Sequence, residues 1–247
     1  MPRFFVDQPL EGQVFLGGED GRHLAKSLRV RPGEEVTLCD GRGADALCKV
    51  LSIQGEGALL QVEKTSPSQG EPQTKVTVCQ CLCKGDKLET VTQKAVELGA
   101  VEIWPLESAR CVVKVDGKSA PKKVARLQKI AREAAMQSGR GVIPQVLAPA
   151  SLKQALEEAA RQGEIFFFYE RGEESLRQAL RAAGERLFVF VGPEGGFAPE
   201  EAALAQSLGA KLLTLGPRIL RTETAPLAAL SAIFYEKGDM KSEAKRS

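Results

Sequence analysis

The sequence predicts an α/β protein in which a small β-barrel domain precedes a domain built on a parallel sheet. Short apolar runs separated by glycine-rich turns fill residues 1–68, a pattern typical of antiparallel strands. The polar segment SPSQGEPQ (66–73) is predicted to be a linker. Over residues 72–240, strand-like and helix-like stretches alternate, which indicates a parallel sheet. Residues 241–247 are expected to be a frayed tail.

The first domain combines short strands with a basic helix. Its strand candidates are VFLGG (14–18), EEVTLCD (34–40), ALCKVLSI (46–53) and ALLQVEK (58–64). The turn DGRGAD (40–45) favours a hairpin between two of these strands. The segment GRHLAKSLRV (21–30) predicts an amphipathic helix with Leu24 and Leu28 on one face. We therefore expect a small barrel that carries one helix.

The second domain contains five apolar runs of strand length. They are KVTVCQCL (75–82), VEIWPL (101–106), EIFFFY (164–169), LFVFV (187–191) and KLLTL (211–215). Runs that are apolar along their whole length suit a parallel sheet covered by helices on both faces.

The helices of the second domain have local start and stop signals. DKLETVTQKAVELG ends at Gly99, which suits the left-handed position after a helix. Ser151 and Gln154 can form a capping box at the start of another helix. Pro199 suits the first turn of the helix in FAPEEAALAQSLG. The apolar segment APLAALSAIFYE predicts a final helix.

Composition favours a globular protein of the cytoplasm. Hydrophobic residues make up 43% of the chain and charged residues 27%, which is ordinary for such proteins. No apolar run reaches the length of a membrane span, and the N-terminus lacks the layout of a secretory signal. Cys79, Cys81 and Cys83 are expected to be buried, reduced thiols. A metal site remains an alternative, but their spacing is not that of a zinc site, and no metal is predicted.

Positive charge is concentrated in two segments, although the net charge of the chain is only +2. Residues 110–140 contain nine Lys or Arg against two acidic residues. The segment RHLAKSLRVR (22–31) adds four Lys or Arg and no acid. Two such segments indicate a polyanionic partner, most simply a nucleic acid. The alternative is that each is merely a solvated helix face.

Polar and glycine-rich residues follow three of the predicted strands. The segments are FFFYERG (166–172), FVFVGPEGGFAPEE (188–201) and LGPRILRTETAP (215–226). Because ligands bind beyond the carboxyl ends of the strands in open α/β sheets, these loops are expected to form one pocket. GPEGG matches neither a dinucleotide motif nor a phosphate loop. It therefore favours an uncharged or cationic ligand, with a plain tight turn as the alternative.

VGPEGGF (191–197) followed by LGPRILRTETA (215–225) resembles the paired motifs of the SPOUT methyltransferases. The resemblance is closest to the RsmE family, which methylates N3 of a uridine in 16S ribosomal RNA. QKAVELG (93–99) and EAAMQSGR (133–140) match upstream, and the N-terminal domain resembles the PUA-like RNA-binding domain of that family. The resemblance covers nearly the whole chain. It implies a SPOUT-type parallel sheet whose C-terminal segment forms a trefoil knot, a rare exception to unthreaded connections.

The resemblance also implies a site for S-adenosylmethionine (SAM) within the three loops. The residues carried over to it are Tyr169, Glu170, Val191, Gly192, Pro193, Glu194, Gly195, Gly196, Leu215, Gly216, Leu220, Arg221, Thr222, Thr224 and Ala225. Leu215 and Leu220, with Ile219, are expected to enclose the adenine. Thr222 and Thr224 are expected to cap the last helix.

The charged residues of these loops suggest catalytic roles. Glu194, Glu170 or Glu223 would suit the positive sulfonium of SAM, although Glu223 could instead form a salt bridge that fixes Arg221. N3 of a neutral uracil carries a proton, and loss of this proton places negative charge on the flanking carbonyl oxygens, which calls for a cation in place beforehand. Arg221 is the first candidate, and Arg140 or Arg132 the second. Glu194 is a candidate general base.

The basic segments are expected to hold RNA. The residues predicted to contact it are Arg22, His23, Lys26, Arg29, Arg110, Lys122, Lys123, Arg132 and Arg140. The resemblance further implies a homodimer that acts on free 16S rRNA or on the assembled small ribosomal subunit. Methylation of another RNA base and non-catalytic RNA binding remain alternatives. An NAD-type oxidoreductase is disfavoured because the dinucleotide motif is missing.

Overall fold

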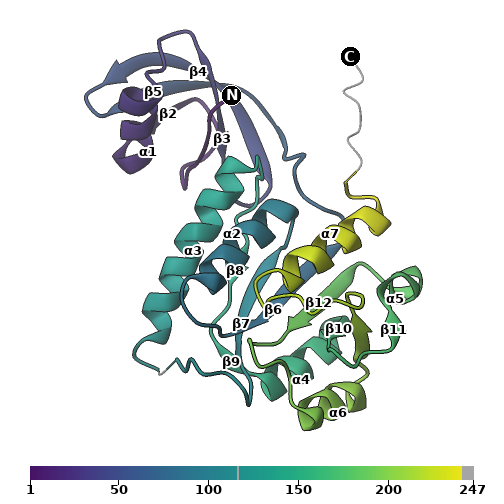
Figure 1. The fold of residues 1–247 in the computed structure, drawn as a ribbon. Coiled ribbons are helices and arrows are strands. Elements are labelled where there is room, and N and C mark those ends of the chain that lie inside the picture. The colour runs from purple at the N-terminus through teal and green to yellow at the C-terminus, as the bar shows by residue number, and fades with distance from the viewer. Residues whose placement is uncertain (116, 241–247) are drawn as a thin grey trace. The chain divides into compact units, whose positions relative to one another are not determined.

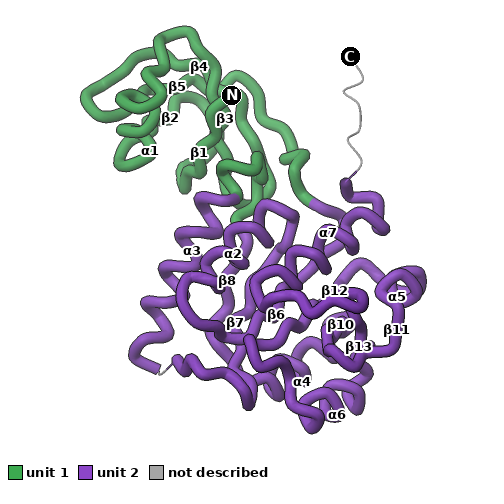
Figure 2. The backbone as a smooth tube through the Cα atoms, in the orientation of Figure 1, with its two compact units in different colours: residues 1–71, 135–143 green, residues 72–134, 144–247 purple. Residues whose placement is uncertain are grey.

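A computed structural model describes residues 1–115 and 117–240, and the chain divides into two compact units (Figures 1 and 2). Unit 1 contains residues 1–71 and 135–143; unit 2 contains residues 72–134 and the chain from residue 144 onward. The second segment of unit 1, 135–143, lies within residues 72–240, which the sequence predicts to form the second domain. The expected frayed tail, 241–247, lies outside the described residues.

Unit 1 is built on a five-stranded sheet with the strand order β1-β3-β4-β5-β2. Its strands are β1 (Arg3–Phe5), β2 (Gln13–Leu16), β3 (Glu35–Cys39), β4 (Ala44–Gln54) and β5 (Gly57–Pro67). β1 pairs with β3 in parallel and the other neighbours are antiparallel, with the predicted hairpin between β3 and β4. Among the described residues no pairing joins β1 to β2, so hydrogen bonds do not close the sheet into the expected barrel.

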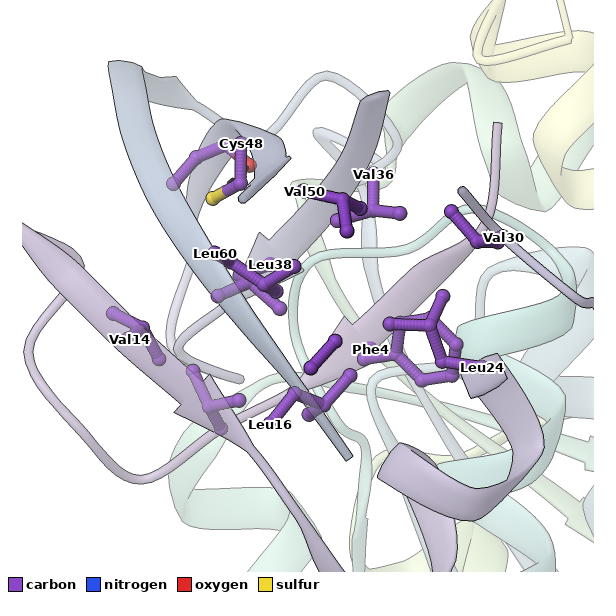
Figure 3. Close-up of a cluster of buried hydrophobic side chains, with 13 residues drawn as sticks. Phe4, Val14, Leu16, Leu24, Val30, Val36, Leu38, Cys48, Val50 and Leu60 are labelled. Carbon is purple, nitrogen blue, oxygen red and sulfur yellow. Dashed lines mark hydrogen bonds between the residues drawn. The ribbon is translucent and has the colours of Figure 1, made fainter. Parts of the chain in front are cut away.

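A single hydrophobic cluster fills unit 1 (Figure 3). All five strands contribute side chains to it, which requires the sheet to curl around the cluster. The buried members are Phe4, Val6, Val14, Leu16, Leu24, Val30, Val36, Leu38, Ala46, Cys48, Val50, Ala58 and Leu60. Phe4 lies on β1, a three-residue strand too short to be recognised from its alternation.

The predicted basic helix forms, but it is shorter and partly irregular. Helix α1 (Gly18–Arg22) continues into the π-helical segment η1 (His23–Ser27). Leu24 is fully buried, whereas Leu28 is 42% exposed, so the two leucines do not share one apolar face as predicted. The regular helical spacing ends at the π-helical segment, and Arg29 then adopts a positive φ of 53°.

The carboxylate of Glu71 attaches residues 135–143 to the rest of unit 1. Arg140 Nη2 donates a hydrogen bond to Glu71 Oε2 at 2.6 Å. The backbone N–H groups of Gly141 and Val142 each donate to Glu71 Oε1 at 3.1 Å. The Arg140 side chain is only 3% exposed, so this is a buried ion pair with satisfied hydrogen bonds.

Unit 2 is built on an eight-stranded sheet in which all recorded pairings are parallel. Its strands are β6 (Lys75–Cys81), β7 (Glu102–Glu107), β8 (Gln145–Val146), β9 (Ala150–Ser151), β10 (Glu164–Phe168), β11 (Glu174–Ser175), β12 (Arg186–Val191) and β13 (Lys211–Thr214). The strand order is β11-β13-β10-β12-β6-β7-β8, and β9 pairs with β7. The five predicted strands of this domain are confirmed; β8, β9 and β11 have only two residues each and carry no periodic signal.

Helices cover the sheet of unit 2 in two groups (Figure 1). They are α2 (Lys87–Leu98), α3 (Ala120–Gln137), α4 (Leu152–Gln162), α5 (Leu176–Ala182), α6 (Pro199–Ser207) and α7 (Ala225–Lys237). α7 packs against α2, β6 and β12, whereas α4 packs against α6, β7 and β10. The left-handed Gly99 after α2 and the capping box of Ser151 and Gln154 are confirmed.

The cysteines behave as small hydrophobic side chains. All six are buried and none forms a disulfide. Within residues 1–115 and 117–240, no group of three or more His, Cys, Asp or Glu side chains is placed to hold a metal ion. In the same part of the chain, no helix has both the length and the apolar character that a membrane span requires.

Candidate functional site

Three strand ends lie side by side in unit 2. β10 pairs with both β12 and β13, and Phe168 at its end is in register with Val191 and Leu213. The loops that follow these strands therefore leave the same edge of the sheet, as predicted. They enclose a cavity of about 630 Å³, a size typical of small-molecule sites.

The cavity collects almost the whole predicted cofactor set. All of these residues line it except Thr224: Tyr169, Glu170, Val191, Gly192, Pro193, Glu194, Gly195, Gly196, Leu215, Gly216, Leu220, Arg221, Thr222 and Ala225. The apolar part of the wall includes Phe168, Leu215 and Leu220. Carboxylates and arginines share the same wall, so the pocket offers both apolar and charged surfaces.

The backbone conformation of the GPEGG loop after β12 requires glycine at two positions. A Cβ atom on Gly192 would lie 3.2 Å from the Cα of Gly196, and Gly196 itself has a φ of +64°. Phe197 then anchors the loop, since its ring packs on Phe167 with the ring centres 4.1 Å apart. Arg110 Nη1 donates to the carbonyl oxygen of Gly195 at 2.8 Å. Arg110, predicted to bind RNA, thus also supports the pocket.

A buried hydrogen-bond network joins two of the loops to β6. Thr222 Oγ1 donates to the carbonyl oxygen of Gly192 at 2.7 Å and accepts from Gln80 Nε2 at 2.9 Å. Gln80 is in register with Val191, which places its amide beside the start of the GPEGG loop. Thr224, the residue before α7, makes no capping bond with its side chain. The predicted caps are therefore wrong, because the Thr222 hydroxyl serves a tertiary contact instead.

Glu194 is held by the segment that follows β6. Its Oε1 atom accepts from Lys87 Nζ at 2.9 Å and from the backbone N–H of Lys84 at 3.1 Å. Burial acts to raise the pKa of Glu194, but these hydrogen bonds outweigh it, and the pKa lies below its ordinary value. A carboxylate that is ionised and already bonded in this way is a weak base.

Glu223 also lies beside Lys87, with Oε2 3.5 Å from Nζ. The predicted alternative, a salt bridge from Glu223 to Arg221, does not form in the described structure. Arg221 lines the cavity, and the described residues supply no ion-pair partner for it. Its guanidinium is thus available to a ligand.

The remaining predicted residues lie elsewhere. Arg140 is buried against Glu71 in unit 1 and is not among the residues that line the cavity. Arg22 and Lys26 are exposed and pair with Glu56, and exposed His23 packs edge-on to Phe4. Arg29 is exposed in unit 1. In unit 2, Lys122 is exposed, while Lys123 and Arg132 are half-buried on α3.

Comparison with known proteins decides the family. The RNA methyltransferase domain family matches residues 70–234, and the RNA methyltransferase PUA domain family matches residues 16–63. The chain belongs to the RNA methyltransferase family. Within this family it is 38% identical to ribosomal RNA small subunit methyltransferase E of Bacillus subtilis, over 96% of this chain and 97% of that protein.

Other members of this methyltransferase family are similar along nearly their whole length. The enzyme of the same name from Mycobacterium bovis is 36% identical, over 93% of this chain and 90% of that protein. The crystal structure of ribosomal RNA small subunit methyltransferase E from Neisseria gonorrhoeae bound to S-adenosyl methionine is 33% identical, with a TM-score of 0.86. That match covers 95% of this chain and 97% of the other.

Sequence reasoning missed part of the pocket wall of this methyltransferase. The additional lining residues are Lys87, Phe168, Phe197, Leu213, Thr214, Pro217 and Arg218. Most of them lie next to residues that were predicted. Lys87 does not: it follows β6, and only the pairing of β6 with β12 brings it to the pocket. Its signal in the sequence is the turn KGDK after an apolar strand.

Proposed function

We propose that this RNA methyltransferase transfers a methyl group from SAM to N3 of a uridine in 16S rRNA. The observation that carries the proposal is the convergence of three loops on one cavity at the carboxyl edge of the parallel sheet. Membership of the RNA methyltransferase family supports the reaction class. The similar protein from Neisseria gonorrhoeae, solved with SAM bound, supports the cofactor.

The residues of the cavity fit SAM. Leu215, Ile219 and Leu220 form an apolar wall for the adenine ring. Gly192 and Gly196 leave backbone close to the ligand where a Cβ atom would be crowded or strained. Glu194 and Glu170 place negative charge near a ligand whose sulfonium is positive. A phosphate-bearing ligand would meet repulsion from the same carboxylates.

Arg221 is the residue that we propose for catalysis. SAM, when bound, supplies an activated methyl carbon. The bond from N3 to this carbon forms as its bond to sulfur breaks, and the N3 proton passes to solvent. A guanidinium beside the uracil carbonyl oxygens stabilises the deprotonated ring, because it remains positive at all relevant pH values.

We do not propose Glu194 as the general base or Arg140 as a catalytic cation, the roles that the sequence suggested for them. The lowered pKa of Glu194, caused by its Lys87 and backbone hydrogen bonds against the opposing effect of burial, makes it a poor general base. We assign it to electrostatic support of the cofactor. Arg140 is buried and bonded to Glu71, so we assign it to the structure of unit 1.

The RNA is expected to contact exposed cations in each unit. In unit 1 these are Arg22, Lys26 and Arg29, with His23 beside them. The match of residues 16–63 to a PUA domain of RNA methyltransferases supports this role. In unit 2 the candidates are cations of α3, including exposed Lys122 and half-buried Lys123. The small ribosomal subunit and free 16S rRNA are the two candidate substrates, and either places the enzyme in the cytoplasm.

A C-terminal trefoil knot and a homodimer complete the proposal. After β13 the chain returns across the sheet, and α7 packs against β6 and β12 beside α2. Thr222 is bonded to Gly192 on this path. A chain that passes through the loop after β12 would explain how such distant segments meet in one buried network. Tyr235 on α7 is 73% exposed, which suits an interface with a second copy.

Transfer of labelled methyl from SAM tests the reaction. Free 16S rRNA and small ribosomal subunits from cells lacking the enzyme would serve as substrates, followed by nuclease digestion and mass spectrometry. We expect 3-methyluridine at one position. Label on a different base would refute the N3 assignment, and binding of RNA without any incorporation would favour the non-catalytic alternative. Titration with NADH tests the oxidoreductase alternative, and we expect it to show no binding.

A further inference from the structure

Lys87 lies between two acidic residues that belong to different loops of the pocket. Its Nζ atom is 2.9 Å from Oε1 of Glu194, in the loop after β12. The same atom is 3.5 Å from Oε2 of Glu223, in the segment before α7. Lys87 also lines the cavity. One cation therefore connects both loops at the rim of the site.

The positive charge of Lys87 compensates a buried carboxylate oxygen of Glu223. Oε2 of Glu223 is buried and has no hydrogen-bond partner among the described residues. The 3.5 Å approach of Lys87 is an ion pair without hydrogen-bond geometry. A desolvated carboxylate oxygen is unfavourable unless a positive charge lies nearby. Removing Lys87 would leave this oxygen uncompensated and facing a second carboxylate.

The positions of the loops and of α2 depend on one another. Glu194 accepts both from Lys87 Nζ and from the backbone N–H of Lys84, so it fixes the turn that leads into α2. The hydrogen bond to Glu194, together with both carboxylate charges, raises the pKa of Lys87 above its ordinary value despite the opposing effect of desolvation. The lysine is charged throughout the neutral range. The contact is therefore not a pH switch in the neutral range.

We propose that Lys87 is a positioning residue for the methyl transfer proposed above. It holds Glu194 and Glu223, and with them the two loops, at the separation that SAM requires. The assignment rests on the proposed function, since it supposes that the cavity binds SAM. Lys87 acts through the two carboxylates and contacts no reacting atom.

The charges of the three residues also suit the cofactor. Two carboxylates and one ammonium leave one negative charge at the rim. SAM carries a sulfonium and an ammonium against one carboxylate, and so has one net positive charge. S-adenosylhomocysteine has the same shape without the sulfonium. Comparing the affinities of the two compounds therefore separates the effect of loop position on binding from the effect of the sulfonium charge.

Calorimetric titration of both compounds against Lys87→Met, Lys87→Arg and wild type tests the proposal. Because the side chains of Lys87 and Glu194 are 32% and 35% exposed, the effect should be moderate. We expect Lys87→Met to weaken S-adenosylhomocysteine binding by about three- to tenfold. The loss for SAM should be smaller, since the extra negative charge favours the sulfonium. Lys87→Arg should restore binding of both compounds to within about twofold of wild type.

Lys94→Met is the matched control. Lys94 lies on the same helix, is also half-buried and also forms an ion pair, with Glu97, but it does not line the cavity. It should bind both compounds as the wild type does. Lys87→Met should unfold at a lower temperature than Lys94→Met, because it also leaves the buried Glu223 oxygen uncompensated. The titrations are therefore run at a temperature where both variants are fully folded, which separates a positioning role from general destabilisation of α2.

Kinetics and a double-mutant cycle complete the test. Lys87→Met should raise the KM for SAM and change the saturated kcat by less than about twofold, because chemistry is untouched. Its effect on binding should shrink when Glu223 is already Gln. Unchanged S-adenosylhomocysteine affinity, failure of Lys87→Arg to restore it, a loss confined to kcat, or an undiminished effect in the Glu223→Gln background would overturn this assignment alone. Wild-type protein that binds neither compound would overturn the proposed function as well.

Discussion

Arg221 brings a permanent positive charge to the pocket wall, and no carboxylate in the described part of the chain neutralises it. If it stabilises the deprotonated uracil, Arg221→Ala should lower the single-turnover methylation rate by about 100-fold. RNA affinity should change by less than about threefold, because one cation among many contributes little to phosphate contacts. Rapid-quench rates and filter binding measure the two quantities. Equal losses in rate and affinity would remove Arg221 from the catalytic role.

Thr222 has a role that its position before a helix conceals. It is 7% exposed, and its hydroxyl both donates to Gly192 and accepts from Gln80. Thr222→Val keeps the shape but removes one hydrogen bond from Gly192 and one from Gln80, so it should lower the free energy of unfolding by about 1–3 kcal/mol. Chemical denaturation measures this change. Thr222→Ser, which keeps the hydroxyl, should lose clearly less; a larger loss for Ser would show that packing, not hydrogen bonding, matters here.

At the scale of a whole loop, Gly195 tests whether GPEGG borders the ligand. A Cβ atom there would lie 3.4 Å from the Cβ of Arg110, an ordinary contact, and the backbone is unstrained. Gly195→Val should therefore fold, yet its branches would occupy cavity space and reduce SAM affinity at least about tenfold. Calorimetric titration measures the affinity. Gly184→Val, in an exposed loop, should bind normally; unchanged affinity in Gly195→Val would count against the pocket.

The ion pair between Arg140 and Glu71, which holds the segment 135–143 in unit 1, allows a test of the structural role of Arg140. Glu71→Gln removes the charge that pairs with a buried guanidinium and should lower the free energy of unfolding by about 3 kcal/mol. Urea denaturation monitors the loss, with exposed Glu11→Gln as the control. If Glu71→Gln is as stable as the control, the Glu71–Arg140 pair is dispensable to unit 1, and a role for Arg140 in RNA binding or catalysis would return.

Across the whole chain, the sequence was most informative where a local pattern decides the structure. Continuous apolar runs predicted the main strands of unit 2, and glycine or capping signals predicted the ends of its helices. The pocket was also predictable, because loops after neighbouring parallel strands must emerge at one edge. The motifs then supplied most of the lining residues. The family resemblance added the cofactor, which spacing alone would not have named.

Partners that are distant in sequence explain what was missed. Nothing in the sequence around Arg140 indicates that its side chain will be buried against Glu71, 69 positions earlier. Lys87 reaches the pocket only because β6 pairs with β12, a strand order that the chain order does not reveal. Thr222 has the local signal of a helix cap, yet the carbonyl oxygen of Gly192 receives its hydrogen bond. Leu28 follows helical spacing that ends at a π-helical segment.

At the scale of the whole molecule, the central question is where the methyl donor binds. A crystal structure of the chain with SAM or S-adenosylhomocysteine measures this directly. The adenine should lie against Leu215 and Leu220, with the sulfur near Glu194 and its methyl group facing Arg221. A donor lodged in another cavity, or crystals that never take it up at saturating concentration, would contradict the assignment of these three loops.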